Sequence, residues 1–223
     1  MATRINNLGK LTLVRHGQST YNLENKFTGW KNVDLTELGI IEANQAGRLL
    51  QAELYDAAYT SNLQRAQKTL DIILGYNDSK LNVVQNIALN ERDYGDLIGQ
   101  NKKEAAIKFG DKQVQIWRRS FDVPPPNGES LEMTYNRTIP YYKNNIEHDI
   151  CNNKSVIISA HGNSIRSIIM YLFQYNKEEI LKTEIGWCEP WIITFKNNKI
   201  INFKIMNRHG APSMSNMPRY PIL

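Results

Sequence analysis

The most informative segment of this chain is Ser155-Val156-Ile157-Ile158-Ser159-Ala160-His161-Gly162-Asn163. Its first six residues are mostly apolar and predict a buried strand, and a helix is expected to follow from Ser164 to Phe173. A strand that enters a helix through a short polar turn is typical of α/β proteins. His161 and Asn163 then lie just beyond the carboxyl end of the strand, which is where open α/β sheets bind their ligands.

A second strand with the same kind of ending lies near the N-terminus. Leu11-Thr12-Leu13-Val14 predicts another buried strand, and Arg15-His16-Gly17 follows it directly. With both motifs at one edge of the sheet, we expect the imidazoles of His16 and His161 to converge there with Arg15.

The rest of the chain continues the alternation of strands and helices. Further strands are predicted at 57–60 and, as a hairpin, at 191–195 and 200–205. Helices are predicted at 63–74, 102–109, 111–119 and 130–147, the last with a kink at Pro140, and another begins at a cap formed by Asp34 or Thr36. This pattern predicts an α/β fold, a three-layer α/β/α sandwich around a mostly parallel sheet. We expect one catalytic domain over residues 1–223, with a mobile tail from about residue 207.

The composition is that of an ordinary globular protein. The 223 residues are 41% hydrophobic and 22% charged, with a formal net charge of +5. The positive residues are scattered, with Arg118-Arg119 as the only arginine doublet, so no basic stripe points to nucleic acid. Cys151 and Cys188 are too isolated for a disulfide framework or a CxxC site. No apolar run approaches the roughly 20 residues of a membrane span, and residues 1–10 lack the apolar core of a signal peptide, so we expect a cytoplasmic protein without membrane contact.

The residues at the two strand ends fit an anionic ligand. An imidazole can act as nucleophile or base, and the guanidinium of Arg15 matches the oxygens of a phosphate. Free N–H groups at the start of the helix after His161 also favour an anion. A lone His-Gly more often holds a structural histidine, and a metal site is a competing interpretation. A metal is disfavoured because no histidine or acidic residue has ligand spacing nearby and Arg15 would repel the cation.

Several short motifs resemble a known family. Leu13-Val14-Arg15-His16-Gly17-Gln18-Ser19, together with the later His161, resembles the histidine phosphatase superfamily, whose members transfer phosphate through a phosphohistidine. Further motifs are similar to those of the cofactor-dependent phosphoglycerate mutases in this superfamily: Asn22, Phe27-Thr28-Gly29-Trp30, Tyr59-Thr60-Ser61, Arg65, Leu89-Asn90-Glu91-Arg92-Asp93-Tyr94-Gly95, Asn101-Lys102, Trp117-Arg118-Arg119 and His161-Gly162-Asn163-Ser164. They extend in family order from about residue 11 to residue 173.

The resemblance implies a role for each matched residue. It implies His16 as the nucleophile and Glu91 as the general acid and base, with a pKa raised by nearby phosphates. The implied partners of the transferring phosphoryl group are Arg15, Arg65 and His161, with Asn22 and Asn163 as neutral donors. The implied contacts to the substrate's carboxylate and second phosphate are Tyr94, Lys102, Arg118 and Arg119, with Thr28 and Gly29 beside them.

Taken singly, several of these residues have simpler explanations. Arg118 and Arg119 fit a solvated helix surface, Glu91 fits a surface ion pair with Arg92, and Tyr94 fits an ordinary core. Only the joint pattern favours a site.

The function implied by the resemblance is the interconversion of 3-phosphoglycerate and 2-phosphoglycerate, primed by 2,3-bisphosphoglycerate and without a metal. The expected partners are small phosphoglycerates, and a homodimer is the expected assembly. Three alternatives stay open: a phosphomonoesterase that needs no primer, a catalytically silent binding module and, from charge alone and ranked last, a nucleic-acid binder.

Two segments depart from the family pattern. Residues 120–128 stand where the family usually carries about two dozen more residues, and Ile185 to Pro190 replaces a Pro-Thr-Gly motif. A shorter cover predicts a more open pocket, in which water competes for the phosphohistidine.

Overall fold

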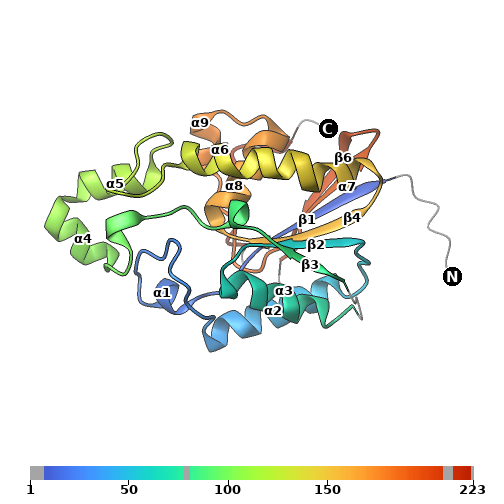
Figure 1. Ribbon diagram of the computed structural model, residues 1–223, viewed down its shortest axis with the longest axis horizontal. Coiled ribbons are helices and arrows are strands. Elements are labelled where there is room, and N and C mark those ends of the chain that lie inside the picture. Colours follow the sequence, from blue (N-terminus) through green and yellow to red (C-terminus); the bar gives the residue numbers. More distant parts are fainter. Residues whose placement is uncertain (1–7, 78–80, 208–212, 222–223) are drawn as a thin grey trace.

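A six-stranded sheet crosses the computed structural model, which describes residues 8–77, 81–207 and 213–221 (Figure 1). The strand order is β3-β2-β4-β1-β5-β6, and the bounds are Gly9–Arg15 (β1), Ala57–Thr60 (β2), Val83–Gln85 (β3), Ser155–Ala160 (β4), Trp191–Lys196 (β5) and Lys199–Ile205 (β6). Strands β3, β2, β4 and β1 pair in parallel, whereas β5 pairs antiparallel with both β1 and β6. The predicted mostly parallel sheet is confirmed.

Helices cover both faces of the sheet (Figure 1). α2 (Glu37–Leu50) and α3 (Gln64–Leu74) lie on one face, and α6 (Leu131–Tyr141), α7 (His148–Cys151) and α8 (Gly162–Phe173) lie on the other, with α9 (Lys177–Lys182) next to α8. All six residues of β4 are buried, since this central strand is covered on both sides. The predicted α/β class and its three layers are therefore confirmed.

The remaining helices gather beyond the carboxyl ends of the parallel strands. α1 (Thr20–Leu23), α4 (Lys102–Phe109) and α5 (Asp111–Arg119) lie past that edge of the sheet (Figure 1). Phe27, Leu97, Ala105 and Val114 form a small core of their own there. None of the helices in the described ranges combines the length and apolar character needed to cross a bilayer.

Two helix starts show how local chemistry sets the boundaries. Thr36, rather than Asp34, caps α2, because its hydroxyl accepts a hydrogen bond from the backbone N–H of Gly39 at 3.0 Å. α8 begins at Gly162, two residues earlier than predicted, with His161 at the N-cap position. The side chain of His161 therefore projects from the first turn of a helix.

The expected helix over 130–147 is interrupted near Pro140. α6 ends at Tyr141, and a π-helical turn follows over Tyr142–Glu147 before α7. Proline has no N–H to donate, so the regular ladder of hydrogen bonds changes close to it. The structure also contains elements that the sequence did not predict, namely α1, α7, α9, β3 and the 3₁₀ turns Ile87–Leu89 and Gly95–Leu97.

Part of the predicted tail, including residues 208–212, lies outside the described residues. Within residues 213–221, the chain packs against the body of the protein. The buried carboxylate of Glu189 accepts hydrogen bonds from the backbone N–H groups of Met214 at 2.7 Å and Ser215 at 2.9 Å. These contacts attach the described part of the C-terminal segment to the loop before β5.

The short segment 120–128 is held against a neighbouring turn. The carbonyl oxygen of Pro126 accepts a hydrogen bond from the N–H of Asp96 at 3.0 Å. Gly95 has φ +51°, and a Cβ at this position would lie 2.2 Å from the same oxygen. Only glycine allows the two segments to approach so closely.

Candidate active site

The two His-Gly motifs meet at the carboxyl edge of the sheet. In the parallel β1–β4 pair Arg15 lies opposite Ala160, and the backbone N–H of His16 donates to the Ala160 carbonyl at 3.0 Å. The imidazole rings of His16 and His161 are 4.9 Å apart between centroids. The structure brings the two histidines together, as the strand pattern predicted.

His16 is buried in a defined tautomer. Its Nδ1 lies 2.6 Å from the carbonyl oxygen of Gly17, so we assign the ring proton to Nδ1. Nε2 then carries the lone pair, which accepts a hydrogen bond from Nε of Arg65 at 3.3 Å. Burial, with the charges of Arg65 and Arg15, holds the pKa of His16 well below the ordinary imidazole value. A neutral imidazole with an available lone pair can act as a nucleophile.

Arg65 is completely buried, and its guanidinium is fixed by backbone oxygens. Nη1 donates to the carbonyl of Lys31 and Nη2 to that of Gly29, both at 2.9 Å. Burial lowers the pKa of Arg65 to about 10, so it remains charged at neutral pH. Gly29, expected to touch substrate, lines no part of the pocket and instead holds Arg65 through its carbonyl.

His161 is also buried and lies behind His16. Its Nε2 is 2.7 Å from the hydroxyl of Ser61, while Nδ1 has no hydrogen-bond partner. Burial, with the charge of Arg65, holds its pKa well below the ordinary value. His161 lies next to His16 but is not part of the pocket surface.

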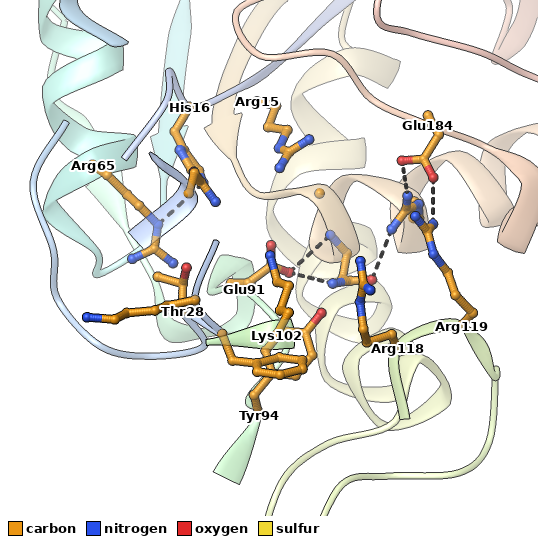
Figure 2. A pocket seen from close by; sticks show the side chains of 16 residues that line it. Arg15, His16, Thr28, Arg65, Glu91, Tyr94, Lys102, Arg118, Arg119 and Glu184 are labelled. Carbon is orange, nitrogen blue, oxygen red and sulfur yellow. Dashed lines mark hydrogen bonds and ion pairs between the residues drawn. The ribbon is translucent and has the colours of Figure 1, made fainter. Parts of the chain in front are cut away.

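Glu91 is surrounded by donors that favour its ionised form (Figure 2). Oε1 accepts hydrogen bonds from the backbone N–H of Arg92 at 2.8 Å, and from the N–H and Nδ2 of Asn163 at 3.1 and 2.9 Å. Burial raises the pKa of this carboxyl, but these bonds and the charges of Arg15 and Arg65 outweigh burial, so the pKa is lowered overall. The predicted raised pKa refers to a carboxyl beside bound phosphates and stays a prediction, since without a ligand the protein's own donors lower this pKa.

A polar pocket opens in front of these groups, as Figure 2 shows. The charged residues that line it are Arg15, Lys26, Arg65, Lys102, Arg118, Arg119 and Arg166, against Glu91 and Glu184. Nε of Arg15 is buried and has no hydrogen-bond partner. Seven cations, two carboxylates and an unpartnered guanidinium N–H fit a ligand with several negative charges. The predicted residues Asn22, Thr28, Tyr94 and Asn163 line the same pocket, beside His16.

The cations of the pocket are close enough to repel one another. Burial lowers the pKa of Lys102, and the charges of Arg118 and Arg15 lower it further. Burial likewise lowers the pKa of Arg15 and of Arg166. A bound anion would relieve this repulsion. Within the described ranges, no group of three or more His, Cys, Asp or Glu side chains could hold a metal ion.

Arg92 stabilises the far side of the pocket, so the alternative of a surface ion pair between Glu91 and Arg92 is wrong. Arg92 is only 1% exposed. Its Nη2 donates to the hydroxyl of Tyr94 at 3.0 Å and to the carbonyl of Arg118 at 3.2 Å. Tyr94 also packs on Phe27, with 5.1 Å between ring centroids. Arg92 thus fixes two predicted substrate contacts relative to each other.

Three charged residues of the pocket were missed from the sequence. Arg166 follows Asn163 by three residues on α8, so the helical spacing of one turn could have found it. Lys26 directly precedes the Phe27-Thr28 motif. No sequence signal marks Glu184, which lies in the segment before β5.

Comparisons with known proteins identify the family. A family model described as histidine phosphatase superfamily (branch 1) matches residues 11–207. The chain belongs to the histidine phosphatase superfamily. The 2,3-bisphosphoglycerate-dependent phosphoglycerate mutase of Bradyrhizobium diazoefficiens is 52% identical over 198 residues, 87% of this chain and 96% of the relative. The enzyme of the same name from Xanthobacter autotrophicus is 52% identical over 183 residues, 81% of this chain and 88% of the relative.

Solved structures of this superfamily have the same fold. A phosphoglycerate mutase from Bacillus anthracis matches with a TM-score of 0.70 at 22% identity, covering 91% of this chain and 93% of that one. The α-ribazole phosphatase of Shigella flexneri matches with a TM-score of 0.78 at 21% identity, covering 92% and 98%. A mutase and a phosphatase share the fold, so the fold alone does not decide the reaction.

Within the histidine phosphatase superfamily, sequence similarity places this chain among the 2,3-bisphosphoglycerate-dependent phosphoglycerate mutases. The match to the Bradyrhizobium relative extends over 198 residues and corresponds to 87% of this chain, so the two chains have nearly the same length within it. A relative with about two dozen additional residues inside the match would not give such values. The short segment 120–128 is therefore compatible with membership of this group.

Proposed function

We propose that this member of the histidine phosphatase superfamily interconverts 3-phosphoglycerate and 2-phosphoglycerate through a phosphohistidine at His16, primed by 2,3-bisphosphoglycerate. The observation that carries the proposal is the neutral, buried imidazole of His16 at a pocket lined by seven cations. Identity near 50% to enzymes named for this reaction supports the choice of substrate.

His16 supplies the nucleophile in the proposed reaction. Its Nε2 lone pair attacks phosphorus, so that an N–P bond forms as the P–O bond to the glycerate oxygen breaks. Arg15 and Arg65 stabilise the charge on the equatorial oxygens, and their positions are already fixed before the reaction. The Nδ1–H bond to the Gly17 carbonyl orients the ring and stabilises the positive charge that phosphorylation places on it.

Glu91 moves the proton. When the phosphoryl group passes from His16 to the 2-hydroxyl, the ionised carboxylate accepts the hydroxyl proton. When Nε2 of His16 next takes the phosphoryl group from position 3, the carboxylic acid returns that proton to the departing oxygen. The lowered pKa of Glu91 suits this order, because the carboxylate is ionised at neutral pH before the first transfer.

The remaining pocket residues hold the substrate at both ends. We assign the carboxylate and the second phosphate to Tyr94, Lys102, Arg118 and Arg119, with Asn22, Thr28 and Asn163 as neutral contacts. The unpartnered Nε of Arg15 and the excess of cations also fit 2,3-bisphosphoglycerate, which when bound supplies the phosphoryl group that His16 carries.

The test is conversion of 3-phosphoglycerate to 2-phosphoglycerate by purified protein, with and without catalytic 2,3-bisphosphoglycerate. We expect stimulated turnover that disappears in His16→Ala. Release of inorganic phosphate without isomerisation would instead identify a phosphatase, and the absence of both activities would favour a binding module.

Three further proposals rest on the sequence. These are a single catalytic domain over 1–223, a cytoplasmic location and a homodimer. Sedimentation of the purified protein tests the last of them.

A further inference from the structure

One carboxylate of the pocket has no part in the proposed reaction. Glu184 lies between α9 and β5, and its two oxygens contact two different arginines (Figure 2). Oε1 is 2.5 Å from Nη1 of Arg119, and Oε2 is 2.7 Å from Nη2 of Arg166. A carboxylate that neutralises two cations of an anion pocket needs an explanation, since it lowers the affinity that those cations provide.

The backbone around Glu184 is held from two sides. Its N–H donates to the carbonyl of Asn216 at 2.8 Å, and its own carbonyl accepts from the N–H of Asn216 at 2.9 Å. The next carbonyl, that of Ile185, accepts a hydrogen bond from Nη1 of Arg15 at 2.8 Å. The segment therefore fixes the position of the carboxylate and also contacts Arg15 beside the nucleophile.

The two arginines that Glu184 holds differ in their surroundings. The side chain of Arg119 is 47% exposed, and that of Arg166 is 14% exposed. Without a counter-ion, an exposed arginine side chain samples many rotamers, and a buried one retains an uncompensated charge. While no ligand is bound, Glu184 restricts the rotamers of the exposed Arg119 and neutralises the charge of the buried Arg166.

A fixed negative charge in this place does not affect all ligands equally. Its repulsion of a bound anion is proportional to the charge of that anion. The binding of a bisphosphorylated glycerate is therefore weakened more than the binding of a monophosphorylated one. In the proposed reaction the bisphosphate must reposition within the pocket before His16 takes the other phosphoryl group, and tight binding of that species slows such a step.

We propose that Glu184 is a specificity-determining residue, an internal counter-ion that orients Arg119 and Arg166 and weakens the binding of bisphosphorylated relative to monophosphorylated ligands. The inference rests on the proposed function for its ligands. It makes a prediction opposite to that of a purely structural role, because removing a scaffold weakens binding whereas removing a counter-ion tightens it.

The experiment measures binding by calorimetry for Glu184→Gln, which keeps the shape of the side chain and removes its charge. A His16→Ala background prevents phosphoryl transfer to the protein during the titration. We expect affinity for 2,3-bisphosphoglycerate to rise about five- to tenfold and affinity for 3-phosphoglycerate about threefold. The ratio of the two affinities therefore shifts towards the bisphosphate.

The matched control is Glu179→Gln on α9. Glu179 forms an ion pair with Arg219 at 2.6 Å, lines no part of the pocket, and its replacement changes the net charge by the same amount. We expect both affinities to stay unchanged in this variant. Thermal unfolding of each variant checks that it is folded.

Two results would overturn the inference: weaker binding of both ligands by Glu184→Gln, or an equal change in both affinities. If the His16→Ala protein binds neither phosphoglycerate, the proposed function fails separately. Inorganic pyrophosphate and inorganic phosphate then replace the two ligands, and the same shift in ratio towards the more charged probe is expected.

Discussion

At the scale of single residues, the amide of Asn163 links two charged groups of the site. Its Nδ2 donates to Glu91 at 2.9 Å, and its Oδ1 accepts from Nη1 of Arg166 at 3.3 Å. A guanidinium can only donate, so Arg166 determines which end of the amide faces Glu91. The proton affinity of Glu91 thus depends on a contact two side chains away.

We expect Asn163→Ala to raise the pKa of Glu91, because the substitution removes a donor to the ionised carboxylate. The acidic limb of the kcat/KM profile should therefore move to higher pH by about one unit. Asn44→Ala removes an amide that contacts Tyr76 away from the pocket and should leave the limb in place. An unchanged limb in Asn163→Ala would contradict the assignment of Glu91 as the base.

The same residues show how far sequence can predict a site. His16 and Glu91 were placed from motifs, because each motif is contiguous. The direction of the pKa shift at Glu91 was not predicted, because besides the N–H of Arg92 it depends on Arg15 and Asn163, which are distant from Glu91 along the chain. Glu184 was missed because it lies in the loop between α9 and β5, and no residue pattern in the sequence predicts the course of that loop.

At the scale of elements, the segment 120–128 is not part of the pocket wall. None of its residues lines the pocket, and Pro126 is instead hydrogen-bonded to the turn at Asp96. With the pocket uncovered by this segment, we expect water to reach the proposed phosphohistidine. We expect release of inorganic phosphate from 3-phosphoglycerate at about one hundredth of the isomerisation rate.

A coupled phosphate assay alongside the mutase assay measures this side reaction. His16→Ala should release no phosphate, which ties the hydrolysis to the same intermediate. Isomerisation with no detectable phosphate release would rule out an open pocket as the cause of hydrolysis.

The elements themselves were predictable where their pattern was long or fully buried. β4 and β2 have the predicted bounds, since their apolar runs are bracketed by polar residues. β3 was missed because it has only three residues and two of them are exposed at the edge of the sheet. α9 carried a usable signal, because Asn176 and Glu179 form a capping box.

At the scale of the whole molecule, folding concentrates charge that the sequence disperses. Six cations of the pocket come from β1, α3, α4, α5 and α8, and Lys26 comes from the segment after α1. Apart from the neighbours Arg118 and Arg119, they are widely separated in the sequence. A net charge of +5 and scattered basic residues gave no sign of this cluster. Net charge describes solubility and general attraction, whereas a site depends on which elements share an edge of the sheet.

Burial of two histidines beside these cations should make the stability of the whole fold depend on pH. His16 and His161 are 3% and 0% exposed, and their pKa values lie well below the ordinary value. In the unfolded chain both titrate near pH 6.5, so below that pH the unfolded state binds about two protons that the folded state does not. The contribution of the two neutral histidines to the free energy of unfolding is therefore fully present above this pH and is lost as the pH falls.

We expect the free energy of unfolding to decrease by about 2–3 kcal/mol between pH 7.5 and pH 5.5, as measured by urea denaturation. The lowered pKa values of Glu91 and Glu184 act in the same direction, but only as the pH falls into the carboxyl range below this window. His16→Gln leaves one buried histidine, so its decrease should be about half as large. Equal stability of the unmodified protein at both pH values would show that the histidines accept protons in the folded state, and Nε2 of His16 would then lack the lone pair that nucleophilic attack requires.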